Sequence, residues 1–291
     1  MSLPAPTPPA PSPADQSIAR LDGLAHRVDT GAEGQRIAWR LFGQGPALVL
    51  LHGGHGSWLH WARNVEALAQ RHRVLVPDLP GFGDSDDLPG PPHAPDRLDR
   101  LVQALGQGIV DCLGPRPQVD LAGFSFGGLI AATAAAAWAP DLPVRRLLLL
   151  GPGGHGQRRP RHVDFVDWRL PDPGQRRAAL RRNLEAFMFH DPARADDLAL
   201  AIHTLACERT RFRSRALSVD DGLWPALAAF GGPVHALWGE HDATAVPHEL
   251  GPLLQARHAG ATWQVIPGAG HWAAYEAADA VNAAMLGALA P

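Results

Sequence analysis

Ser125 stands at the centre of Gly123-Phe124-Ser125-Phe126-Gly127, a run in which glycines lie two residues to either side of a serine. An apolar stretch precedes this run, and an alanine-rich stretch with helical character follows it. A sharp turn between a strand and a helix leaves little room for side chains beside the serine, which accounts for both glycines. The pattern is that of a nucleophile held on a tight turn, and it predicts attack by Ser125 on an electrophilic carbon.

A serine hydroxyl needs a base to take its proton, and a histidine base needs a carboxylate to fix its tautomer. His271 and Asp242 supply these groups after Ser125, each just beyond an apolar stretch that reads as a strand. We therefore predict the set Ser125, Asp242 and His271. Glu240 is a second, weaker candidate for the acid, and His241 is interpreted as a bystander.

Attack on a carbonyl group produces an anionic oxygen, which backbone N–H groups can stabilise. One donor is expected from Phe126, the residue after the serine. The other is expected from the glycine-rich loop His52-Gly53-Gly54, which follows an earlier apolar stretch. We predict Gly54 as this donor because a small residue lets the backbone approach a substrate closely, with Gly53 as the alternative.

The elements that must position these residues alternate along the chain. Continuous apolar runs typical of buried parallel strands are separated by helical patterns, one of which places apolar residues three and four apart from Leu98 to Leu113. The runs cover residues 47–51, 74–76, 119–122, 146–150, 234–239 and 262–266. Such alternation predicts an α/β fold with a parallel sheet between two layers of helices.

The ends and the middle of the chain depart from this alternation. Residues 1–24 are expected to form a disordered tail, because proline and alanine dominate residues 2–14. Period-two patterns at 26–29 and 36–41 predict an antiparallel hairpin at the sheet edge. Residues 152–230 show helical patterns only, so they are predicted as an inserted helical cap. The core is then 25–151 and 231–291.

Composition narrows the function. The 291 residues carry a formal net charge of −3, which argues against nucleic acid as a partner. The two cysteines, Cys112 and Cys207, imply no disulfide framework. No signal peptide or apolar run of membrane-spanning length is apparent, so we expect a cytoplasmic protein without a membrane partner.

Taken together and in order, these motifs resemble the α/β-hydrolase superfamily over about residues 25–290. The matching pieces are residues 52–54, 78–85, 123–127, 239–242 and 270–272. The resemblance implies an eight-stranded, mostly parallel sheet, a cap over the site, and neither cofactor nor metal. Because a serine and not an aspartate stands at the turn, the chain resembles those members of the superfamily that pass through an acyl-enzyme.

Within that superfamily the pattern is similar to the hydrolases of meta-cleavage products, which split carbon–carbon bonds. Trp272 directly after His271, the tryptophan-rich run after the glycine loop, and arginines in the cap carry this likeness. It implies an arginine that holds a substrate carboxylate, for which Arg209 and Arg211 are the candidates. Phe124 stands where that family has a polar asparagine, so Phe124 and Trp272 are expected to line a more apolar site.

The sequence thus predicts a serine hydrolase, either a carboxylesterase or a carbon–carbon hydrolase, which cleaves acyl bonds of small substrates, anionic ones included. Alternatives are a cofactor-free haloperoxidase or perhydrolase, and a slow-turnover ligand-binding receptor on the same fold. The substrate's identity and the oligomeric state are left open, with a homodimer as one alternative.

Overall fold

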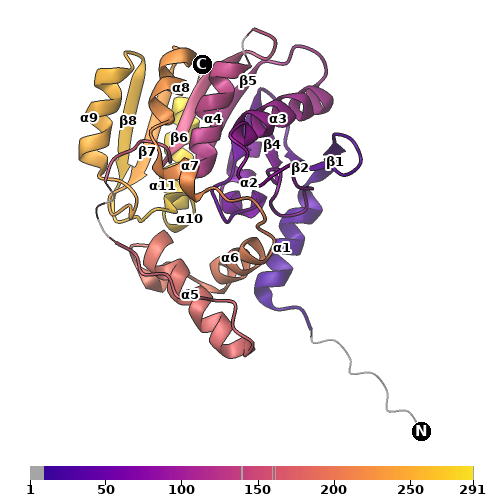
Figure 1. Cartoon of the computed structure of the whole chain (residues 1–291), viewed down its shortest axis with the longest axis vertical. Coiled ribbons are helices and arrows are strands. Elements are labelled where there is room, and N and C mark those ends of the chain that lie inside the picture. The colour runs from indigo at the N-terminus through magenta and orange to yellow at the C-terminus, as the bar shows by residue number, and fades with distance from the viewer. Residues whose placement is uncertain (1–9, 139, 159, 161, 291) are drawn as a thin grey trace.

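The computed structural model describes residues 10–138, 140–158, 160 and 162–290. These residues form an eight-stranded sheet between helices (Figure 1). The strands are β1 (His26–Thr30), β2 (Ile37–Phe42), β3 (Ala47–Leu51), β4 (Arg73–Pro77), β5 (Val119–Phe124), β6 (Val144–Leu150), β7 (Val234–Gly239) and β8 (Ala261–Ile266). The apolar runs in the sequence therefore mark the parallel strands correctly.

The strands lie in the order β1-β2-β4-β3-β5-β6-β7-β8. β1 pairs with β2 and β2 with β4 in antiparallel fashion, whereas every pairing from β4 to β8 is parallel. The α/β class, the mostly parallel sheet and the edge hairpin are confirmed. β3, β5 and β6 are neighbours, so the loops that leave their carboxyl ends meet at one edge of the sheet.

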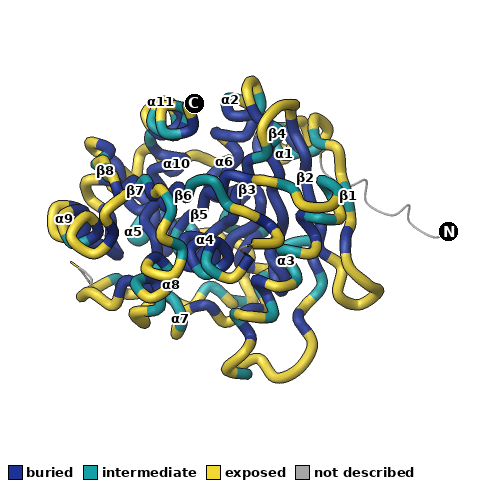
Figure 2. The backbone as a smooth tube through the Cα atoms, turned by 90° about the horizontal axis from the view of Figure 1, so that it is seen from above, coloured by how far each residue is buried: buried dark blue, intermediate teal, exposed yellow. Residues whose placement is uncertain are grey.

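Both faces of the sheet are buried (Figure 2). Along β3, Val49 and Leu51 belong to one apolar cluster, and Leu48 and Leu50 to the other. This alternation follows from the period-two geometry of a strand. The first cluster includes residues of α3 (Arg97–Leu113), α4 (Phe126–Ala137), α8 (Leu223–Phe230) and α9 (Pro247–Arg257). The second includes residues of α1 (Pro13–Leu24), α2 (Val65–Ala69), α10 (Ala273–Glu276) and α11 (Ala278–Ala288).

The predicted tail is shorter than expected, because residues 13–24 form helix α1. The Ser12 side chain accepts from Asp15 N at 3.2 Å, and the Asp15 carboxylate accepts from Ser12 N at 3.0 Å. This reciprocal cap stabilises the helix start, and Pro13 fits its first turn. Leu21 is only 2% exposed in the second apolar cluster. Of the remaining predicted tail, residues 10–12 have no helix or strand, and residues 1–9 lie outside the described residues.

The predicted cap also divides differently. Residues 152–172 contain no helix or strand at the positions that the structure describes. They lead into α5 (Pro173–Met188), a short 3-10 turn at Pro192–Arg194, α6 (Asp197–Glu208) and α7 (Arg215–Val219). α5 and α6 pack together beyond one end of the sheet (Figure 1). α8, however, buries Leu223 and Leu227 in the cluster that contains α4, so it belongs to the sheet's helical layer.

A buried histidine connects the loops that follow β3 and β4. His52 Nε2 accepts from Leu79 N at 3.0 Å, and Nδ1 donates to Gly53 O at 2.8 Å. Burial lowers the pKa of His52 to about 4, although the charge of Asp78 opposes this shift. A proton on Nε2 would face the Leu79 N–H, so this bridge needs a neutral ring.

The docking of α1 can be tested within the helix itself. We expect Leu21→Ala to lower the free energy of unfolding by about 2–4 kcal/mol, since it removes buried apolar volume. Leu24→Ala is the matched control, because that side chain is 53% exposed at the end of the same helix. Urea unfolding followed by circular dichroism measures both. Equal, negligible effects would show that α1 does not pack on the core.

The buried His52 predicts acid sensitivity. The pKa of His52 is about 4 in the folded protein and 6.5 in the unfolded chain. Its contribution to the free energy of unfolding is therefore fully present above pH 6.5 and is lost as the pH falls toward 4. Between pH 7 and pH 5 we expect this residue to reduce the free energy of unfolding by about 2 kcal/mol.

Urea titrations at pH 7, 6 and 5 measure the slope of the free energy of unfolding against pH. His52→Asn should lower stability at pH 7 yet flatten the pH dependence, whereas His26→Asn, at an exposed strand position, should leave the slope unchanged. If His52→Asn kept the pH dependence of the parent protein, His52 would not be the source of the acid sensitivity.

Candidate active site

The sharp turn predicted at Ser125 is present. β5 ends at Phe124 and α4 begins at Phe126, so Ser125 alone makes the connection. Its backbone has φ 53° and ψ −117°, a conformation that is unfavourable for a residue with a side chain. Ser125 N donates to Leu150 O of β6 at 2.9 Å, which fixes the turn against the sheet. The side chain itself is half-buried and therefore reachable.

The two flanking glycines are required by contact. A Cβ on Gly123 would lie 2.2 Å from Gly127 O, and one on Gly127 would lie 2.3 Å from Leu51 O. Both distances are shorter than any real contact to backbone oxygen. The absence of side chains thus lets the helix start press against the ends of β3 and β5.

The structure brings Ser125, His271 and Asp242 into one hydrogen-bonded line. His271 Nε2 lies 3.0 Å from Ser125 Oγ, and His271 Nδ1 lies 2.9 and 3.0 Å from the two Asp242 carboxylate oxygens. Since the carboxylate accepts from Nδ1–H, Nε2 is left to accept from the serine hydroxyl. This arrangement can transfer the serine proton to His271.

Asp242 is held as an ionised carboxylate. Thr244 donates to its Oδ1 from the backbone N at 2.7 Å and from the hydroxyl at 2.8 Å. Burial alone raises the pKa of Asp242, but the electrostatic attraction and hydrogen bond of His271, together with the hydrogen bonds from Thr244, outweigh burial, so the pKa of Asp242 lies below its usual value. Glu240, the weaker candidate, instead accepts from Gly268 N at 2.9 Å at an exposed position.

Within the described part of the chain, two backbone N–H groups beside Ser125 lack an acceptor. Gly53 N donates to His60 Nδ1 at 3.2 Å, which removes the alternative that the sequence left open. Among the described residues, neither Gly54 N nor Phe126 N has a hydrogen-bond acceptor. A Cβ on Gly54 would lie 3.8 Å from Phe126 Cβ, so the two residues are neighbours. Their geometry suits an anionic oxygen beside the serine.

His60 is a site-supporting residue that the sequence analysis did not single out. Burial and the neighbouring histidines His52, His203, His271 and His55 hold its pKa well below the usual value, so the ring is neutral. It accepts from Gly53 N, and its carbonyl oxygen accepts from Trp272 Nε1 at 2.9 Å. His60 therefore couples the glycine loop to the residue after His271. One of fifteen histidines in the sequence, it carries no local signal of this role.

Aromatic rings surround the imidazole of His271. The ring centroid of Phe124 lies 5.0 Å away and that of Phe187, from α5, 5.2 Å away. Phe187 in turn lies 5.3 Å from Phe165, on the segment before α5. Trp272 is fully buried, with its indole N–H donated to His60 O. Phe124 thus lies beside the predicted site, whereas Trp272 contributes a buried hydrogen bond to His60.

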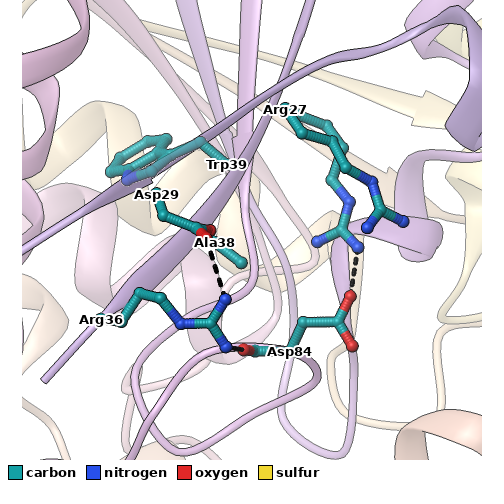
Figure 3. A pocket seen from close by; sticks show the side chains of 7 residues that line it. Arg27, Asp29, Arg36, Ala38, Trp39 and Asp84 are labelled. Carbon is teal, nitrogen blue, oxygen red and sulfur yellow. Dashed lines mark hydrogen bonds and ion pairs between the residues drawn. The ribbon is translucent and has the colours of Figure 1, made fainter. Parts of the chain in front are cut away.

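Arg209 and Arg211 are not brought to Ser125. Arg209 donates to Asp84 Oδ1 at 2.6 Å, and Arg211 donates to Ser85 O and Arg209 O. Asp84 lines a polar hollow of about 320 Å³ at the β1–β2 edge, together with Arg27, Asp29, Arg36 and Arg40 (Figure 3). Both predicted substrate arginines are therefore engaged in structural contacts.

The described residues contain no group of three or more histidine, cysteine or acidic side chains that could hold a metal ion. Within the same part of the chain, no helix is both long and apolar enough to cross a bilayer.

Comparisons with known proteins agree with this architecture. The chain is 31% identical over 281 residues to a 2-hydroxy-6-oxo-6-phenylhexa-2,4-dienoate hydrolase of Burkholderia cepacia, covering 90% of this chain and 94% of the relative. It is 29% identical to a 2-hydroxy-6-oxononadienedioate/2-hydroxy-6-oxononatrienedioate hydrolase of Comamonas testosteroni, with the same coverage.

Solved structures show the same fold. A meta-cleavage product hydrolase, CumD, superposes with a TM-score of 0.71 at 22% identity, covering 89% of this chain and 96% of the other. An esterase from Rhodococcus sp. ECU1013 gives 0.69 at 21% identity, covering 90% and 97%. A model described as the alpha/beta hydrolase family matches residues 48–284. The chain belongs to the alpha/beta hydrolase family.

Proposed function

We propose that the protein is a serine hydrolase that cleaves acyl bonds of small substrates through an acyl-enzyme. The observation that carries this proposal is the 3.0 Å contact between His271 Nε2 and Ser125 Oγ, with Nδ1 held by Asp242. A neutral imidazole in this tautomer can accept a proton, and the buried carboxylate stabilises the imidazolium that forms.

The proposed reaction proceeds in two halves. Ser125 Oγ bonds to the substrate's carbonyl carbon while its proton passes to His271 Nε2, and that proton then goes to the leaving group as its bond to carbon breaks. A water molecule next attacks the acyl carbon, giving one proton to His271. The acid is released as this proton returns to Ser125 Oγ.

Gly54 N and Phe126 N are the proposed donors to the anionic oxygen of both tetrahedral intermediates. Phe126 is the first residue of α4, so the positive end of the helix dipole adds to its N–H. Each such donor contributes about 3–4 kcal/mol to the stability of the transition state in enzymes of this kind.

Two kinds of acyl bond fit this site, ester-like bonds and ketonic carbon–carbon bonds. The rings of Phe124 and Phe187 beside His271 favour an aromatic or otherwise apolar acyl group. Carbon–carbon cleavage is supported by the dienoate hydrolases named above, which match the chain over most of their length. The engagement of Arg209 with Asp84 removes one support for an anionic substrate.

Removal of the nucleophile tests the mechanism. We expect Ser125→Ala to reduce turnover of p-nitrophenyl acetate by about 10³-fold or more, with an unchanged circular dichroism spectrum. Ser17→Ala, which alters a half-buried serine whose hydroxyl bonds within α1 to Pro13 O, should retain full activity. Turnover of 2-hydroxy-6-oxo-6-phenylhexa-2,4-dienoate is measured for the parent protein and for Ser125→Ala. The ratio of the parent's turnover of the ester to its turnover of the dienoate decides between ester and carbon–carbon cleavage. Full turnover of either substrate by Ser125→Ala would rule out the serine mechanism for that substrate.

The choice of acid is tested by a matched pair of substitutions two residues apart. Asp242→Asn should lower kcat by about 10⁴-fold, because an amide no longer stabilises the imidazolium or the correct tautomer. Glu240→Gln should have little effect, since that carboxylate faces Gly268 N. Steady-state kinetics on the preferred ester measure both variants. A larger loss in Glu240→Gln would reverse the assignment.

A further inference from the structure

The chain that leaves α6 returns to the sheet beside the proposed oxyanion site. In this return segment, residues 211–214, Arg211 N and Phe212 N both donate to Gly81 O, at 2.8 and 3.1 Å. The Phe212 ring lies 5.7 Å from that of Phe82 and 5.5 Å from that of Phe126. The segment is thus fixed both to the loop after β4 and to the first residue of α4.

Ser214 ends this segment, and its backbone is held by Ser218 of α7. Its carbonyl oxygen accepts from Ser218 N and Ser218 Oγ, each at 3.0 Å. The residue is 4% exposed. Its hydroxyl does not cap α7, and it has no hydrogen-bond partner among the described residues. The hydroxyl oxygen is nevertheless not fully enclosed, because it is not one of the wholly buried polar atoms that lack a partner, so a ligand or a water molecule can reach it.

The position of the hydroxyl relates it to the oxyanion donors. A Cβ on Gly54 would lie 2.4 Å from Ser214 Oγ and 3.8 Å from Phe126 Cβ. Ser214 Oγ therefore lies against the backbone of Gly54, on the side where Phe126 approaches.

From this geometry we propose that the Ser214 hydroxyl is a third hydrogen-bond donor to the anionic oxygen formed when Ser125 attacks. The inference rests on the proposed function and adds a catalytic residue to it. A hydroxyl hydrogen rotates freely, so Ser214 can turn its O–H toward the oxygen that Gly54 N and Phe126 N bind. A hydrogen bond to an anionic oxygen is stronger than one to a neutral carbonyl, so the effect falls on the transition state.

Two substitutions separate hydrogen bonding from packing. Ser214→Ala removes the donor, and Ser214→Cys keeps a side chain of similar size that donates only weakly. On p-nitrophenyl acetate we expect both to lower kcat by about 10- to 100-fold while KM changes by less than about 2-fold. Thr133→Ala is the control, since that half-buried hydroxyl bonds within α4 to Leu129 O, and it should keep the parent kcat.

A second readout reports the oxyanion directly. A trifluoromethyl ketone that adds to Ser125 forms a stable anionic oxygen, so its affinity for both variants should fall by the same factor as kcat/KM. A Ser214→Ala enzyme with the parent kcat and inhibitor affinity would overturn the inference. Full activity in Ser214→Cys beside a loss in Ser214→Ala would also overturn it, because shape alone would then account for the loss.

The Ser125 and Ser214 variants distinguish a failure of the third donor from a failure of the acyl-enzyme mechanism. Persisting turnover in Ser125→Ala would remove the acyl-enzyme mechanism itself. An inactive Ser125→Ala beside a fully active Ser214→Ala would remove only the third donor. If Ser214→Ala fails to fold, the kinetics and inhibitor affinity of Ser214→Cys decide the matter, with unchanged values counting against the proposal.

Discussion

The backbone conformation of Ser125 is the constraint on which the site depends. With φ at 53°, the residue is strained, and neighbouring contacts must hold it in place. Its N–H bonds to Leu150 O, and its carbonyl oxygen accepts from Gly128 N and Gly153 N. Contacts to β6, to α4 and to the chain after β6 therefore offset the strain, and they hold the residue where its hydroxyl meets His271 Nε2.

The order of the parallel strands converts long separations in sequence into short distances. Gly54 follows β3, Ser125 follows β5, Asp242 follows β7 and His271 follows β8. Ser125 and His271 are 146 residues apart, yet their side chains lie within hydrogen-bonding distance. Since parallel strands share the direction of their carboxyl ends, no special loop is needed to assemble these groups, only a sheet in this order.

This regularity explains why much of the architecture could be predicted. A buried parallel strand has to be apolar throughout, and a residue directly after it lies at the sheet's edge, so the positions of Ser125, Asp242 and His271 follow from local patterns. Helix α1 was missed because the prolines before it dominate the composition, although Ser12 and Asp15 have capping-box spacing. The partners of Arg209 could not be predicted, since Asp84 is 125 residues away and a long side chain reaches many groups.

Neutral histidines explain how polar groups can be packed tightly around the glycine loop. His52 accepts from Leu79 N and His60 accepts from Gly53 N, so each ring uses one nitrogen as a buried acceptor for a backbone N–H. A protonated ring could not accept in this way, and burial disfavours the charge. His60 also engages Gly53 N, so Gly54 is the member of the glycine pair whose N–H no described residue accepts. The identity of the free donor thus depends on a tautomer outside the loop, a relation that only the folded structure can reveal.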